Sequence, residues 1–83
     1  MQQPNNRLTT SDLKTASFLI SKKVPLLKVD KSRPRKVNFI FERTPLVNKL
    51  LDLYWKGKAE TNVRLLFESL DQLKDAIFRD YDI

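Results

Sequence analysis

The chain of 83 residues contains no cysteine and no histidine, and Gly57 is its only glycine. Without cysteine it cannot form a disulfide or a thiolate metal site. Without histidine it lacks the side chain most often used in general acid–base catalysis. One glycine is too few for the glycine-rich loops that bind nucleotide phosphates. We therefore expect a protein that is not an enzyme and that holds no cofactor and no metal.

Long apolar runs are also missing. No stretch reaches the roughly 20 apolar residues that a transmembrane helix needs, and residues 1–7 are polar, unlike a secretory signal. We expect a cytoplasmic protein with no membrane partner. The hydrophobic fraction of 41% and the charged fraction of 31% are typical of a folded chain, and the length allows one domain. Such a small domain has a limited core, so pairing with a second copy would add stability.

The positive charge is concentrated in one segment. Residues 22–36 hold seven basic side chains and one acid, Asp30, which accounts for the whole net charge of +6. The basic residues are Lys22, Lys23, Lys28, Lys31, Arg33, Arg35 and Lys36. Beyond residue 67 the chain is acidic, with five carboxylates against Lys74 and Arg79. This layout can bind an anionic partner or a second copy of the chain.

Helix signals occur three times along the chain. Residues 11–22 carry apolar side chains at helical spacing, and Thr10 or Ser11 can serve as the N-cap. A second helix begins at Thr44-Pro45, where a capping hydroxyl precedes a proline at the first helical position.

The end of the second helix and the start of the third are also marked. Gly57 can adopt the left-handed conformation that follows many helices, so we expect the second helix to end beside it. The third helix is expected over residues 62–80, with Thr61 or Asn62 as its cap. Its apolar residues alternate steps of three and four, the pattern of a helix with one buried face.

The segment 35–42 is the clearest strand in the sequence. Its apolar and polar side chains alternate, which places Val37, Phe39 and Phe41 on one face. Ile40 interrupts the polar face, which indicates that this face is partly covered, for example by another molecule.

A first strand is expected over residues 24–29. Pro25 has no amide donor, so this strand lies at an edge or begins just after the proline. A turn over residues 30–34 joins it to the strand at 35–42, which predicts an antiparallel hairpin.

These elements give the order α-β-β-α-α. We expect an α+β fold in which an antiparallel two-stranded hairpin packs on three helices, because a lone hairpin is marginally stable in water. Residues 10–83 would form this domain, and the polar residues 1–9 a flexible N-terminal arm.

Two weaker groups allow more than one interpretation. Glu68, Asp71 and Asp75 lie close together on the third helix and could contact a cation such as magnesium. The same spacing is typical of a solvated helix face, which we prefer. Tyr54 and Trp55 lie beside lysines and could stack on an unpaired base. We prefer packing on the core or at an interface.

The basic segment carries the strongest functional signal. A two-stranded ribbon with charges on both strands and on its turn can enter a major groove or lie along a phosphate backbone. Lysine on exposed strands also blocks edge-to-edge pairing. Our first hypothesis is a small non-enzymatic accessory protein that binds DNA or RNA through this basic hairpin, with the seven basic residues of 22–36 as its site. The alternative is a protein-interaction module or homodimeric adaptor with no nucleic-acid role.

The caps, the strand and the helix stripe together resemble a known family. The chain is similar, over residues 9–80, to short prokaryotic and phage proteins grouped as a domain of unknown function. The matching segments are Thr10–Leu13, Lys36–Glu42, Thr44-Pro45, Tyr54–Gly57 and Leu73–Phe78. The resemblance implies a free-standing prokaryotic or phage protein and carries over no functional residues.

Overall fold

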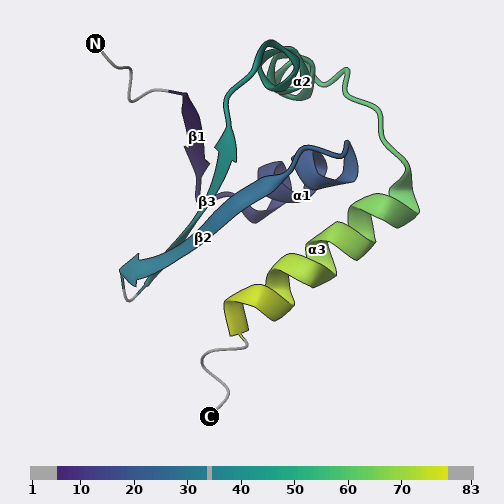
Figure 1. The fold of residues 1–83 in the computed structure, drawn as a ribbon. Helices are drawn as coiled ribbons and strands as arrows, with labels where there is room; N and C mark the ends of the chain where they lie inside the picture. The colour runs from purple at the N-terminus through teal and green to yellow at the C-terminus, as the bar shows by residue number, and fades with distance from the viewer. Residues whose placement is uncertain (1–5, 34, 79–83) are drawn as a thin grey trace.

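The computed structural model describes residues 6–33 and 35–78, which form three strands and three helices (Figure 1). The elements are β1 (Arg7–Thr10), α1 (Leu13–Ser21), β2 (Leu26–Arg33), β3 (Lys36–Glu42), α2 (Pro45–Trp55) and α3 (Val63–Phe78). The α+β class and the three helices are confirmed. The two-stranded hairpin is corrected to a three-stranded antiparallel sheet with the strand order β1-β3-β2.

The added strand β1 lies where a flexible arm was expected. It pairs with β3, and Leu8 lies opposite Phe41 with its side chain buried. The expected arm is therefore wrong for residues 7–9, and residues 1–5 lie outside the described part of the chain. The free edge of β3 supplies hydrogen-bond partners for the main chain of this short, mostly polar segment. The sequence of the segment alone does not predict a strand.

Strand β2 begins after Pro25, as expected, but continues to Arg33 instead of ending at residue 29. The turn expected over residues 30–34 is therefore wrong in its first four positions. Pairing with β3 keeps these polar residues extended: Asp30 lies opposite Asn38, and the register shifts between Asp30 and Arg33. The pairing of β2 with β3 in an antiparallel hairpin is confirmed.

The first helix is capped by Asp12, and not by Thr10 or Ser11. The amide of Lys14 donates to Asp12 Oδ1 at 3.2 Å, and the hydroxyl of Thr15 donates to Asp12 Oδ2 at 2.6 Å. The bond from Lys14 satisfies one of the main-chain donors that the first turn of a helix leaves without partners. The Thr15 hydroxyl holds the pKa of Asp12 below its ordinary value, and the main-chain bonds act in the same direction.

The signals for the second and third helices are confirmed. Thr44 Oγ1 accepts from the amide of Val47 at 3.2 Å. Gly57 follows α2 with a φ of 73°, in the left-handed region. Asn62 caps α3, since its Oδ1 accepts from the amide of Leu65 at 3.0 Å.

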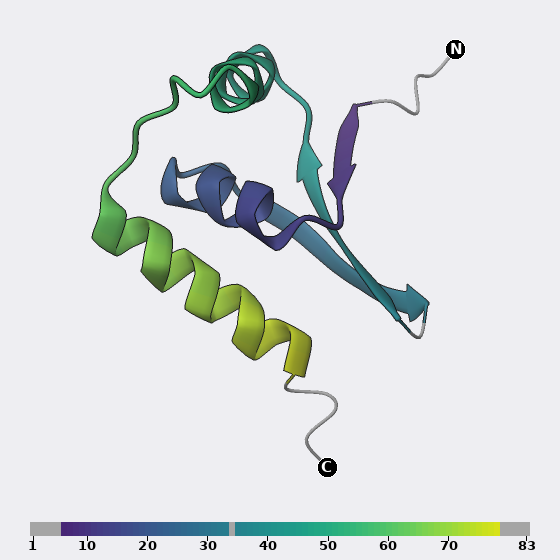
Figure 2. The ribbon, with the colours of Figure 1, turned by 180° about the vertical axis from the view of Figure 1, so that it is seen from behind.

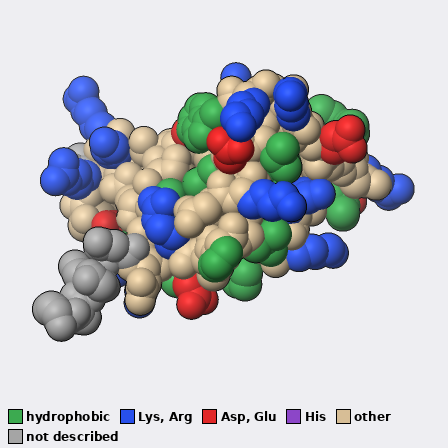
Figure 3. Space-filling model, turned by 90° about the horizontal axis from the view of Figure 1, so that it is seen from above, with side chains coloured by type: hydrophobic (Ala, Val, Ile, Leu, Met, Phe, Trp, Pro, Cys, Tyr) green, Lys and Arg blue, Asp and Glu red, His purple; other side chains and the backbone are tan. Residues whose placement is uncertain are grey.

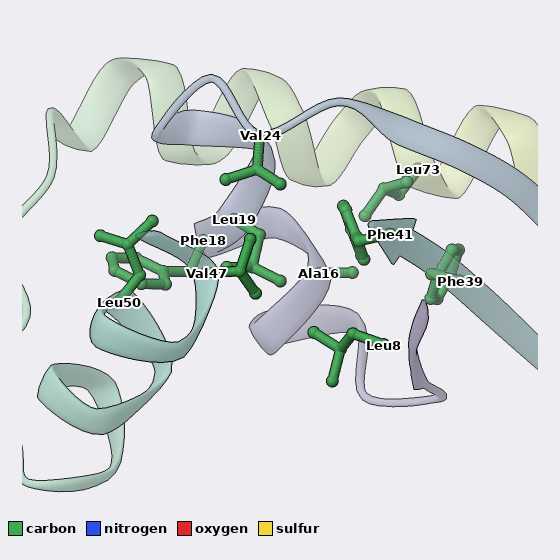
Figure 4. Packing of buried hydrophobic residues seen from close by; sticks show 10 residues of the cluster. All are labelled: Leu8, Ala16, Phe18, Leu19, Val24, Phe39, Phe41, Val47, Leu50 and Leu73. Carbon is green, nitrogen blue, oxygen red and sulfur yellow. The ribbon is translucent and has the colours of Figure 1, made fainter. Parts of the chain in front are cut away.

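The core lies between the sheet and the helices (Figure 4). Phe39 and Phe41 of β3 are almost fully buried, which confirms the inward face of this strand. The other buried hydrophobic residues are Leu8, Ala16, Phe18, Leu19, Val24, Val47, Leu50 and Leu73. All three helices lie on the same side of the sheet, so no described helix covers its other face (Figures 1 and 2).

Candidate functional site

The uncovered sheet face carries basic side chains from all three strands. Lys28 and Thr9 flank Ile40, and Arg7 lies opposite Glu42, so these residues share the face that points away from the core. Ile40 is half-buried although no described helix covers this face, because the two neighbouring strands shield its side chain. Sequence reasoning missed Arg7, because the strand that positions it was not expected.

The tip of the β2–β3 hairpin extends this surface. Arg33 and Lys36 are cross-strand partners, and Arg35 lies in the turn between them. All three side chains are exposed. We name these side chains on the face and at the tip the basic sheet face: Arg7, Lys28, Arg33, Arg35 and Lys36.

Two acids lie within the basic sheet face, Asp30 and Glu42. The amide of Ser32 donates to Asp30 Oδ1 at 3.0 Å. Hydrogen bonds from Ser32 lower the pKa of Asp30, and the charges of Lys28 and Arg33 act in the same direction. Asp30 is therefore a negative charge held between two cations, and five cations against two acids leave the face positive.

The other basic candidates lie elsewhere. Lys31 is half-buried in β2 and points to the opposite side of the sheet, where its ammonium group donates to the main-chain carbonyl of Ala76 in α3. Lys22 is the half-buried C-cap of α1, and Lys23 follows it with a φ of 70°. The structure therefore brings four of the seven residues together and separates Lys22, Lys23 and Lys31 from them.

Viewed from above, lysine and arginine side chains also project at several separate places around the molecule (Figure 3). Hydrophobic side chains lie between them on this face. Trp55 is the most exposed of the large hydrophobic residues described, with 69% of its area accessible. Tyr54 packs on Phe18 with ring centroids 5.3 Å apart, so the expected packing holds for Tyr54, whereas Trp55 only touches the edge of Tyr54.

A pocket of about 500 Å³ opens between α1, the connector after α2, and α3. Its lining is mainly apolar and includes Phe18, Tyr54, Leu66 and Phe67, with Lys14 as its charged residue. A volume and lining of this kind fit an apolar ligand group or a side chain of a partner.

Two of the hydroxyl groups that line the pocket, those of Ser17 and Thr61, already have partners. Ser17 Oγ donates to the carbonyl of Leu13 at 2.8 Å, and Thr61 Oγ1 lies 2.7 Å from Ser21 Oγ. No group of three or more His, Cys, Asp or Glu side chains comes together within residues 6–33 and 35–78. The expectation of no cofactor stays a prediction. None of the described helices is long and apolar enough to cross a membrane.

The fold and these surfaces define a small two-layer α+β protein with an open basic sheet face and an apolar pocket. The sequence matches the family model described as Domain of unknown function (DUF5659) over residues 5–79. The chain therefore belongs to this family, and the resemblance is confirmed, while the prokaryotic or phage origin stays a prediction. Comparison with curated proteins and with solved structures found no match.

Proposed function

We propose that this protein is a small non-enzymatic accessory protein of the cytoplasm that binds nucleic acid through the basic sheet face. The observation that carries the proposal is the arrangement of Lys28, Arg33 and Lys36 on a face that no described helix covers, with Arg35 at its tip. Lysine and arginine on an open, positively charged surface attract phosphate groups. When they bind a nucleic acid, they release the counterions that had neutralised its phosphates.

The composition of this face favours contacts with phosphates over contacts with bases. Sheet surfaces that bind single-stranded RNA stack the bases on aromatic side chains. The outward positions of β3 hold Lys36, Asn38, Ile40 and Glu42, none of them aromatic. We therefore expect binding with little sequence preference and with a steep dependence on salt concentration.

The test is fluorescence anisotropy with labelled single-stranded DNA, duplex DNA and RNA, each titrated at several salt concentrations. The binding variant changes Lys28, Arg33, Arg35 and Lys36 to glutamine. If these residues contact phosphates, the variant lowers the affinity at low salt at least tenfold. It also reduces the slope of log K against log salt by about 3–4.

A matched control removes the same charge from the rest of the surface. It changes Lys23, Lys49, Lys56 and Lys58 to glutamine, all of which are exposed and lie off the basic sheet face. We expect this control to retain most of the affinity. Equal losses in both variants would indicate attraction by net charge alone, and an absence of binding at low salt would contradict the proposal.

A second candidate function, the protein-interaction module, is supported by the pocket beside Phe67. Phe67 is 58% exposed, and large exposed apolar side chains beside a recess are typical of protein contacts. A monomeric protein that binds none of the three nucleic acids would make an external protein partner the better proposal.

A further inference from the structure

The solvent-facing side of α3 carries three large apolar side chains. Val63, Phe67 and Phe78 are 62%, 58% and 60% exposed. Phe67 and Phe78 are eleven residues apart, close to three full turns of an α-helix, so they project from the same side. The two buried residues of the helix, Ser69 and Leu73, lie on its opposite side. No described element covers the exposed stripe.

Two opposite charges lie between the phenylalanines. Asp71 and Lys74 follow Phe67 by four and seven residues, which places both on the same stripe. Both side chains are exposed, and neither forms an ion pair within residues 6–33 and 35–78. The stripe therefore reads apolar, acidic, basic, apolar along the helix.

Read in the opposite direction, the stripe is apolar, basic, acidic, apolar. Two antiparallel copies would therefore place apolar against apolar and acidic against basic side chains. An antiparallel pair of α3 helices with a two-fold axis between positions 72 and 73 sets position 67 opposite 78. The same axis sets position 71 opposite 74. Each Phe67 then meets a Phe78, and each Asp71 meets a Lys74, which is the self-complementarity that a closed two-fold contact requires.

We propose that two copies of the chain pair through α3 in this antiparallel arrangement, with Phe67 against Phe78 and Asp71 against Lys74 across the axis. This inference goes beyond the proposed function and does not depend on nucleic-acid binding. The pocket supports it, because Phe67 lines the pocket and the ring of Phe78 from the second copy would arrive beside its apolar mouth.

The edges of the sheet are less suited to pairing with a second copy. Strand β1 has only four residues, and β2 has two register shifts and carries Lys28 and Arg33 along its length. Short edge strands, bulges and lysines are the devices that prevent edge-to-edge association. A single pair of helices buries less area than a standard interface, so we expect a dissociation constant in the micromolar range or weaker.

The test measures the mass of the protein by sedimentation equilibrium from low micromolar to high micromolar concentration. Asp71→Lys and Lys74→Asp each turn two attractive pairs into two repulsive ones, so each alone should weaken the dimer about tenfold. The double variant restores opposite charges across the axis and should recover the affinity. Phe78→Ser, at an exposed position, should also weaken the dimer tenfold or more.

Glu60→Lys is the matched control. It makes the same change of charge in the exposed connector, off the stripe, and should leave the dimer unchanged. Recovery in the double variant also separates a direct contact from a loss of folding. A chain that stays monomeric at all concentrations overturns the proposal, and so does a dimer that none of the stripe variants weakens.

Discussion

The ammonium group of Lys31 in β2 donates a hydrogen bond to the main-chain carbonyl of Ala76, two residues before the end of α3. The last carbonyls of a helix have no intrahelical donor and carry the negative end of its dipole. Lys31 therefore joins the edge of the sheet to the end of α3.

This contact predicts a loss of stability when the charge of Lys31 is removed. Lys31→Met retains an apolar stem but removes the donor, and we expect it to lower the free energy of unfolding by about 1 kcal/mol. Urea unfolding followed by circular dichroism measures the change. Lys28→Met, on the open side of the same strand, is the control and should change stability by less than about 0.5 kcal/mol. Equal effects of the two substitutions would contradict the assignment of Lys31.

The burial of Phe39 predicts a severe effect of its removal. Only 1% of Phe39 is exposed, and Phe39→Ala should cost about 3–5 kcal/mol because it deletes a core ring and leaves a cavity. A domain of this size has a total stability on the order of 5 kcal/mol, so the variant should melt near or below room temperature. Ile40→Ala, on the other face of the same strand, should cost much less. Thermal melts that rank the two variants in the reverse order would show that the strand faces are exchanged.

Gly57 gives a test of backbone conformation without a packing effect. Its φ is 73°, and a Cβ built on it meets no atom within 4 Å. Gly57→Ala should therefore cost about 1 kcal/mol, the penalty of the left-handed conformation alone. Asn tolerates this region better, so Gly57→Asn should cost less than Gly57→Ala. If urea unfolding gave the alanine variant and the wild type equal stabilities, the left-handed conformation of Gly57 after α2 would be contradicted.

The cap of α1 predicts a dependence of stability on pH. The pKa of Asp12 lies below its ordinary value of 3.8, so its carboxylate contributes stability above pH 3.8 that is lost as the pH falls through the lowered pKa. Asp12→Ala should cost about 1 kcal/mol at pH 7. The difference in the free energy of unfolding between this variant and the wild type should be smaller at pH 2.5. A gap of constant size at both pH values would show that the charge of Asp12 does not contribute.

Local signals were sufficient for the helices. Thr44, Asn62 and Gly57 act within one turn of the chain, through hydrogen bonds or a single dihedral angle, so their roles could be predicted from neighbouring residues. The cap of α1 was misplaced by one or two residues, at Thr10 or Ser11, because Asp12 competes with these hydroxyl residues and no local pattern decides among them.

Long-range pairing explains what the sequence did not predict. Strand β1 exists because β3 has a free edge, and the polar end of β2 is extended because it pairs with β3. The candidate site depended on these strands. Arg7 belongs to the site because β1 pairs with β3. Lys31 does not, because the alternation of side chains along β2 points it toward α3. A segment rich in lysine and arginine shows how much charge is present, whereas the register of the strands decides where each charge points.

The placement of all three helices on one side of the sheet has a consequence for the paired form (Figure 2). Two copies that meet through α3 would stack their helical layers at the centre and leave one sheet on each outer surface. The two basic sheet faces would then point in opposite directions, and a single dimer could bridge two separate nucleic-acid strands.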